Sequence, residues 1–263
     1  MEKVEVLQTK KLSLFVSNRV FIKRSLLQST RNIEVLITSI MLPIMLMLMF
    51  TYVFGGAIDP SGQYVNYVVP GIILLCAAFG SSSTAVDIST DMTNGIMDRF
   101  RTMPIQSSGV ITGHVVASLL RNLLATGIVI FVAFMVGYEP NCTFTEWISA
   151  IGIIVLFILA FTWLFAAIGL LVSSPSAASG YGFILLFLPY LSSAFVPTST
   201  MPKWLRGIAE NQPITPLTET IRNLLNGGNV QNHIWWAIGW CLFILVGSFI
   251  WSNWLFHRKS GRR

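Results

Sequence analysis

The sequence has 263 residues, of which 54% are hydrophobic and only 11% are charged. This balance excludes an ordinary water-soluble domain, in which about 25% of residues carry charge. The net charge of +6 does not indicate nucleic-acid binding, because 11 of the 17 Lys and Arg residues lie before the first apolar block or after the last one.

Six apolar blocks follow one another along the chain. A helix needs about 20 residues to cross a hydrocarbon core of about 30 Å, and these blocks lack the alternating pattern of a membrane β-barrel. The sequence therefore predicts an all-α polytopic membrane protein that forms one transmembrane domain over residues 1–263. The expected spans are 34–54, 65–86, 110–136, 147–172, 180–196 and 234–256.

The positions of the basic residues predict the orientation of the chain. Lys and Arg collect on the cytoplasmic flanks of membrane spans, and the loops at 55–64 and 137–146 contain neither residue. We therefore expect both termini in the cytoplasm of a bacterial cell, with the chain in the plasma membrane. An even number of spans agrees with this orientation, and generic solvated tails are compatible with it as well.

The first segment, residues 1–32, is predicted to be an amphipathic cytoplasmic element. Apolar residues recur at three- and four-residue steps over 4–27, with Lys and Arg between them, which is typical of a helix lying in the membrane interface. A short cytoplasmic cap helix is the alternative. In the first span, Pro43 should kink the helix unless neighbouring groups satisfy the carbonyl that it frees.

A dense group of charges lies in the connection 87–109, between the second and third spans. On a helix, three apolar side chains of this connection fall on one face at positions i, i+4 and i+7, with charged residues on the other faces. This pattern is typical of a protein-docking element, and a loop whose apolar face rests on the bilayer fits it equally well. The candidate residues are Ile96, Asp98, Arg99, Phe100, Arg101 and Met103.

The longest connection, 197–233, is predicted to contain two short amphipathic helices on the external side. Pro202 opens the first, and Thr215 with Pro216 forms an N-cap and first-turn proline of the second. Gly227 is expected to stop that helix. Because the preceding span is only about 17 residues long, we expect these helices to re-enter the membrane or to cap the bundle.

Several catalytic patterns are missing from the sequence. It contains no G-x-x-x-x-G-K-[ST] phosphate loop, no H-E-x-x-H and no G-x-S-x-G. None of the three His residues has a carboxylate at helical spacing, and the three Cys residues show no metal-ligand spacing. We therefore expect no catalytic residues, no metal site and no cofactor bound by this chain.

Two stretches resemble the membrane subunits of type-2 ABC exporters. The stretch DMTNGIMDRFRTMPIQSSGVITGHVVASLLRNLL is similar to the family's acidic segment, Gly, Arg-containing helix and Thr-x-Pro. Its matching residues are Asp91, Gly95, Asp98, Arg99, Arg101, Thr102 and Pro104. The stretch MPKWLRGIAENQPITPLTETIRNLLNGG resembles the external element of daunorubicin-resistance-like permeases, through Pro202, Trp204, Leu205, Asn211, Pro213, Thr215 and Arg222. One departure is Thr-Asn before Gly95, where many relatives have Arg-Glu.

The resemblance implies a permease that exports a hydrophobic drug, antibiotic or peptide. Residues 91–103 would form a coupling helix seated on a cytoplasmic ABC ATPase, and two ATPase copies would carry ATP and Mg²⁺. A second permease copy, identical or related, would complete the path. Membrane lipid is the remaining expected partner, and nucleic acid is not expected.

Arg121 is the charge that lies deepest inside a predicted span. Such a charge costs roughly 2.5–3.5 kcal/mol at the bilayer centre, although snorkelling to the inner surface relieves much of this cost. We interpret Arg121 as a structural anchor; a position on the substrate path, facing anionic head groups, is the alternative. Glu34, at the start of the first span, is either its ion partner or an interfacial acid.

Three other functions fit parts of the pattern. An exporter of lipid or lipid-linked glycan would have the same topology, although the Trp residues lie mainly where interface belts place them. A non-transporting membrane scaffold or assembly factor would differ in having no ATPase partner. A membrane-embedded lipid-modifying enzyme would need clustered catalytic residues, and the sequence suggests none.

Overall fold

The computed structural model describes residues 22–25, 33–59, 62–96, 108–229 and 233–260, and every regular element in these ranges is helical. Five segments of this described part are long and apolar enough to cross a membrane. They are α2 (Ile33–Leu48) with its continuations η1 (Met49–Phe54) and α3 (Gly55–Ile58), α4 (Tyr64–Thr93), α6 (Ser108–Val136), α7 (Phe144–Leu171) and α11 (His233–Ser260). The prediction of an all-α polytopic membrane protein is therefore confirmed.

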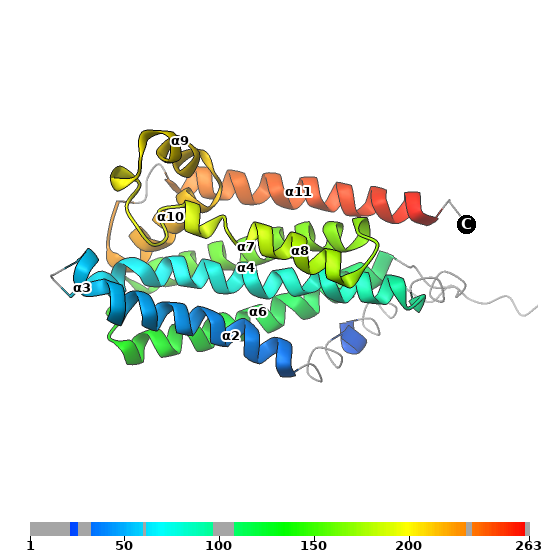
Figure 1. The fold of residues 1–263 in the computed structure, drawn as a ribbon, viewed down its shortest axis with the longest axis horizontal. Helices are drawn as coiled ribbons and strands as arrows, with labels where there is room; N and C mark the ends of the chain where they lie inside the picture. The colour runs from blue at the N-terminus through cyan, green and yellow to red at the C-terminus, as the bar shows by residue number, and fades with distance from the viewer. Residues whose placement is uncertain (1–21, 26–32, 60–61, 97–107, 230–232, 261–263) are drawn as a thin grey trace, which may run out of the picture.

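The fifth apolar block, 180–196, does not form a long helix. Helix α8 (Pro175–Leu185) begins earlier than expected and has only 11 residues, and turns and the short η2 (Pro189–Leu191) follow it. The chain still passes from one end of the bundle to the other across this stretch (Figure 1). Five of the six expected spans are therefore long helices, and the remaining passage is short and broken.

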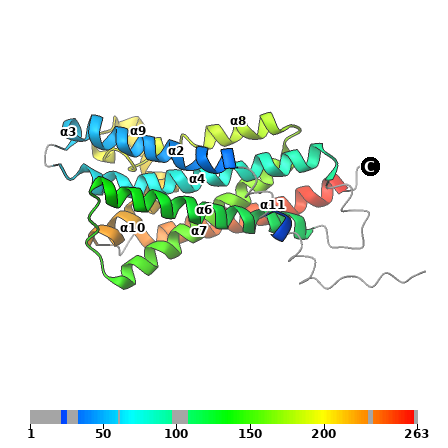
Figure 2. The ribbon, with the colours of Figure 1, turned by 90° about the horizontal axis from the view of Figure 1, so that it is seen from below.

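Helix α4 lies at the centre of the bundle, where α2, α6, α7 and α8 pack against it (Figures 1 and 2). Helices α2 and α8 flank the same face of α4 (Figure 2). We call the end at which α4 and α11 finish the basic end, because Lys23, Arg24 and Arg258 lie there. The opposite end carries η3 (Thr198–Thr200), α9 (Lys203–Asn211) and α10 (Ile214–Asn226).

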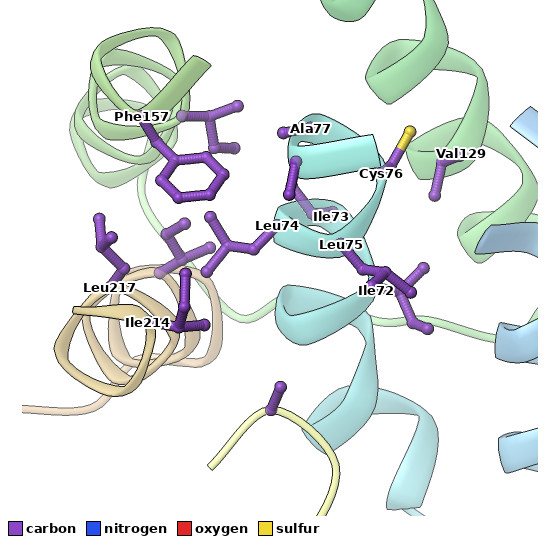
Figure 3. Packing of buried hydrophobic residues seen from close by; sticks show 14 of the residues in the cluster. Ile72, Ile73, Leu74, Leu75, Cys76, Ala77, Val129, Phe157, Ile214 and Leu217 are labelled. Carbon is purple, nitrogen blue, oxygen red and sulfur yellow. The ribbon is translucent and has the colours of Figure 1, made fainter. Parts of the chain in front are cut away.

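The core is built where α4, α7 and α10 meet. Leu74 of α4 points toward Phe157 of α7 and toward Ile214 and Leu217 of α10 (Figure 3), and all four side chains are fully buried. Fully burying one such side chain stabilises the fold by about 1.5–3 kcal/mol where water is the alternative. Helix α10 is thus part of the bundle core, whereas α9 exposes Trp204.

Two prolines inside helices have their freed carbonyls satisfied by other segments. Pro43 leaves the carbonyl of Ser39 without a helical donor, and the Cys76 thiol donates to that oxygen at 3.7 Å. Pro70 of α4 leaves the carbonyl of Asn66, and the side-chain amide of Asn226 donates to it at 2.8 Å. These contacts meet the condition under which a proline is tolerated in a membrane helix.

The broken passage after α8 is stabilised by side chains from distant parts of the chain. The hydroxyl of Tyr64 donates to the carbonyl of Phe195 at 2.7 Å, and the hydroxyl of Tyr67 donates to that of Ser193 at 2.9 Å. Arg222 of α10 also donates to the Ser193 carbonyl, at 2.8 Å. Buried non-helical backbone needs hydrogen-bond partners of this kind, and these side chains supply them.

The start of α10 corrects one prediction, and its end confirms another. Helix α10 begins before Thr215, whose hydroxyl donates to the carbonyl of Ala209 instead of capping the helix. The N-cap position is occupied by Pro213, so the assignment of Thr215 as N-cap was wrong. Gly227 ends α10 with a φ of +74°, the left-handed conformation expected of a C-terminal glycine. The re-entrant arrangement stays a prediction.

Candidate functional site

A buried charge cluster lies at the basic end of the bundle, which we call the Asp91 cluster (Arg24, Asp91 and His114). The Asp91 carboxylate is 2% exposed and accepts two hydrogen bonds from Nη2 of Arg24, at 3.0 and 3.3 Å. Nε2 of His114 lies 3.0 Å from Oδ2 of the same carboxylate and donates to it. A buried acid with two donors of this kind is firmly held in place.

The Asp91 cluster joins three segments that are separate in the sequence. Arg24 belongs to the N-terminal segment, Asp91 lies in the last turn of α4, and His114 lies in the second turn of α6. Helix α4 ends at Thr93, and Gly95, two residues later, has a φ of +68°, which favours glycine. The cluster therefore sits at the base of the connection 97–107. Asp91 lies just before this connection in the sequence, and His114 lies just after it.

The structure describes only part of the predicted docking segment. Ile96 is described and half-buried, just after the turn that ends α4. Asp98, Arg99, Phe100, Arg101 and Met103 lie outside the described residues. Their arrangement on one helix stays a prediction, as does the amphipathic helix over 4–27, of which only residues 22–25 are described.

Arg121 is held against α4 by polar groups. Its Nη1 lies 3.5 Å from Oδ2 of Asp87, its Nη2 donates to the hydroxyl of Ser83, and its side chain is 6% exposed. Asp87 precedes Asp91 by four residues, so α4 presents the two acids one above the other along one face. Arg121 is thus part of the helix packing. The side chain of Glu34 lies outside the described residues.

A row of small polar side chains continues from this pair into the middle of the bundle. The Thr84 hydroxyl donates to that of Ser118 at 2.8 Å, and the Asn122 amide donates to the Ser81 hydroxyl at 3.2 Å. The Thr162 hydroxyl donates to Ser81 as well, at 3.2 Å. Interhelical hydrogen bonds of this kind are each worth up to about 1–2 kcal/mol in membranes. They fix the register of α4, α6 and α7.

A groove runs along the face of α4 that α2 and α8 flank, and we call it the α4 groove. It consists of two adjoining hollows of about 420 and 210 Å³, which share Phe79, Phe183 and Leu186. The larger hollow is partly polar, and its hydroxyl-bearing residues are Thr38, Ser39, Ser82, Ser83 and Ser179. The smaller hollow is almost wholly apolar and reaches Tyr190. The α4 groove is therefore amphipathic along its length.

Stacked aromatic rings lie beside Tyr190, at one end of the α4 groove. The ring centroids of Phe50 and Phe195 are 4.6 Å apart, and those of Tyr190 and Phe195 are 5.0 Å apart. Phe50 belongs to η1 and Tyr190 to η2, so the stack bridges the continuations of α2 and α8. Such stacks are worth about 0.5–1.5 kcal/mol beyond the area that they bury.

Sequence reasoning missed the contact between His114 and Asp91. Helical spacing within one segment cannot show it, because the two residues lie on neighbouring antiparallel helices. A usable signal was their similar distance from the middle of the connection that joins α4 and α6. Within the described residues, no group of three or more His, Cys, Asp or Glu could hold a metal ion.

Known proteins are similar to this chain in sequence. A family model described as ABC-2 type transporter matches residues 17–226. The chain is 29% identical to a daunorubicin resistance ABC transporter permease protein, DrrB1, of Streptomyces coeruleorubidus, over 81% of this chain and 74% of that protein. It is 25% identical to a probable doxorubicin resistance ABC transporter permease protein, DrrC, of Mycobacterium tuberculosis, over 87% of both chains. It is also 26% identical to a putative transport permease, ycf38, of Cyanophora paradoxa, over 86% of this chain and 78% of that protein.

Proposed function

The chain belongs to the ABC-2 type transporter family and is a membrane permease of an ABC transporter, and we propose that it exports a hydrophobic drug, antibiotic or peptide. A separate cytoplasmic ATPase supplies the energy, and ATP and Mg²⁺ bind to that subunit. The observation that carries the proposal is the family match over 17–226, which contains both the Asp91 cluster and the α4 groove.

In this proposal the connection 97–107 docks on the ATPase. The Asp91 cluster then transmits movement of the ATPase from this connection to the helices of the bundle. The clustered contacts at the base of the connection support this role, because a force on the connection reaches α4, α6 and the N-terminal segment together. The basic end is then cytoplasmic, as expected from the Lys and Arg distribution. Residues 22–25 and the end of α11 lie at this same end (Figure 1).

The α4 groove is the part of the chain that we assign to the cargo. Two permease copies, identical or related, pair with this face inward, so that the α4 grooves line one path. The apolar stretch near Leu75 suits a hydrophobic molecule, and the hydroxyls near Ser82 suit a polar group. The same amphipathic lining favours a lipid or lipid-linked glycan as the second candidate cargo.

Assembly with the ATPase is the experiment that tests this function. We expect the chain, coexpressed with an ABC ATPase from its own genome, to copurify with it in a complex that hydrolyses ATP. The purified chain alone should show no turnover, because the sequence contains no phosphate-binding loop. Turnover by the isolated chain, or a chain that never captures an ATPase, would support the scaffold or enzyme alternatives instead.

Filling the α4 groove should block transport. Ser179 of α8 is exposed and lines the larger hollow, so the indole of Ser179→Trp would occupy the space that cargo needs. We expect transport of a lipophilic dye by vesicles of the complex to fall by about tenfold, while copurification of the ATPase stays unchanged. Ser176, on the same helix and also exposed, does not line the hollow, so Ser176→Trp is the control. Equal transport by the two variants would remove the α4 groove from the cargo path.

A further inference from the structure

A separate hollow, of about 570 Å³, lies at the opposite end of the bundle, between α9, α10 and the start of α11. We call it the indole pocket. Among the described residues, its lining shares none with the α4 groove, and Ile96 does not line it. The lining includes Glu210, Asn211, Glu219, His233, Trp236 and Trp240. This mixture of carboxylates and indoles differs from the hydroxyl and alkyl lining of the α4 groove.

Two carboxylates of the indole pocket are held in place by arginines. Oε1 of Glu219 accepts from Nη1 of Arg222 at 2.7 Å, and Oε1 of Glu210 accepts from Nε of Arg206 at 2.7 Å. Among the described residues, Oε2 of neither glutamate has a hydrogen-bond partner. Each carboxylate therefore keeps a free acceptor oxygen in a fixed position.

Arg222 does not cancel the charge of Glu219 for a ligand in the pocket. Its guanidinium lies 3.7 Å from the ring centroid of Tyr67 and donates to the carbonyl oxygens of Tyr67 and Ser193, on the side toward the bundle core. The Arg222 side chain is 9% exposed, whereas that of Glu219 is 26% exposed. The carboxylate is thus the more accessible member of this pair.

The two indoles come from one face of α11. Trp236 and Trp240 are four residues apart, so their side chains lie one above the other along the helix, and both line the pocket. Tryptophan is the best cation–π partner among the aromatic side chains. Trp235 and Trp236 are similarly exposed, at 75% and 66%, but of these two only Trp236 lines the pocket, so we interpret Trp235 as an ordinary interfacial tryptophan.

From this arrangement we propose that the indole pocket binds an organic ammonium group. Indole faces and carboxylate oxygens both attract such a cation, and the combination is the usual means of recognising alkylammonium ligands. Anions are disfavoured by the two glutamates. The ammonium group belongs either to a soluble amine or to the head group of a zwitterionic lipid such as phosphatidylethanolamine. The proposal requires neither transport nor the ATPase.

The test is equilibrium dialysis of radiolabelled tetraethylammonium against the full chain in nanodiscs of phosphatidylglycerol, which has no ammonium group. We expect saturable binding that weakens by about tenfold in Trp236→Ala and in Glu219→Gln. Trp235→Ala and Glu139→Gln change an exposed indole and an exposed carboxylate outside the pocket and should bind like the original chain. Glu210→Gln is a second variant that removes a carboxylate from the pocket. Thermal melting of each variant separates loss of the binding site from loss of the fold.

Further arms of the experiment identify the occupant. Competition when phosphatidylethanolamine replaces part of the phosphatidylglycerol supports the site and assigns it to a lipid head group. Unchanged binding in those nanodiscs also supports the site and assigns it to a soluble amine. The proposal is overturned if tetraethylammonium does not bind, if Trp235→Ala weakens binding as much as Trp236→Ala, or if maltose displaces the cation, which would indicate a glycan site.

Discussion

Asp91→Asn should lower the free energy of unfolding by about 3 kcal/mol and should loosen the connection 97–107. Breaking a buried charge pair costs about 3–5 kcal/mol, because the remaining charges stay buried without compensation. We take the lower end of this range because the Arg24 side chain is 30% exposed and keeps part of its hydration. Unfolding of the purified chain in detergent measures the effect.

Asp87→Asn is the matched control for this substitution. It removes the same charge from the same helix, but Asp87 is 23% exposed and lies 3.5 Å from its partner Arg121. Its loss should therefore cost clearly less. Equal losses from the two substitutions, or an Asp91→Asn chain as stable as the original, would show that the Asp91 cluster does not hold the basic end together.

Phe100→Ala should separate the chain from its ATPase. We place Phe100 with Ile96 and Met103 in a groove on the partner, and removing a buried aromatic anchor often costs 2 kcal/mol or more. The affinity for the ATPase should then fall by about 30-fold, as measured by copurification and by ATP turnover of the complex. Membrane insertion should not change, because residue 100 lies outside the five long apolar helices.

Arg99→Ala is the control for Phe100→Ala. A charge at the rim of an interface usually contributes less than a buried aromatic anchor, so this variant should keep most of its partner affinity. If Phe100→Ala retains full binding and turnover while Arg99→Ala does not, the contact is electrostatic. If neither variant loses binding, the connection is better understood as a loop that rests on the bilayer.

The long helices were predictable because the apolar composition and the length of a segment decide whether it can cross a membrane as a helix. The run of apolar residues that ends near Ile58 and the one that begins near Phe144 both exceed what one membrane crossing requires. The stop of α10 at Gly227 was predictable for a local reason, since a left-handed residue is needed there.

The broken passage after α8 could not be predicted, because its stability comes from remote side chains. Tyr64 and Arg222 supply hydrogen bonds to the carbonyls of residues 193–195 from positions far away in the sequence. The same holds for Asp91, whose partners depend on how α4 and α6 pack and on where the N-terminal segment lies. Sequence periodicity describes one helix at a time and does not contain this information.

Reconstituted transport tests the central claim most directly. The chain and its ATPase are placed together in proteoliposomes with the ATPase outside, and accumulation of a lipophilic dye is followed after ATP is added. We predict accumulation that requires ATP, the ATPase and this chain together, and that an ATPase unable to hydrolyse ATP does not support. Accumulation without this chain, or an assembled and ATP-hydrolysing complex that moves no lipophilic or lipid-linked cargo, would contradict the assignment of this chain as the export path.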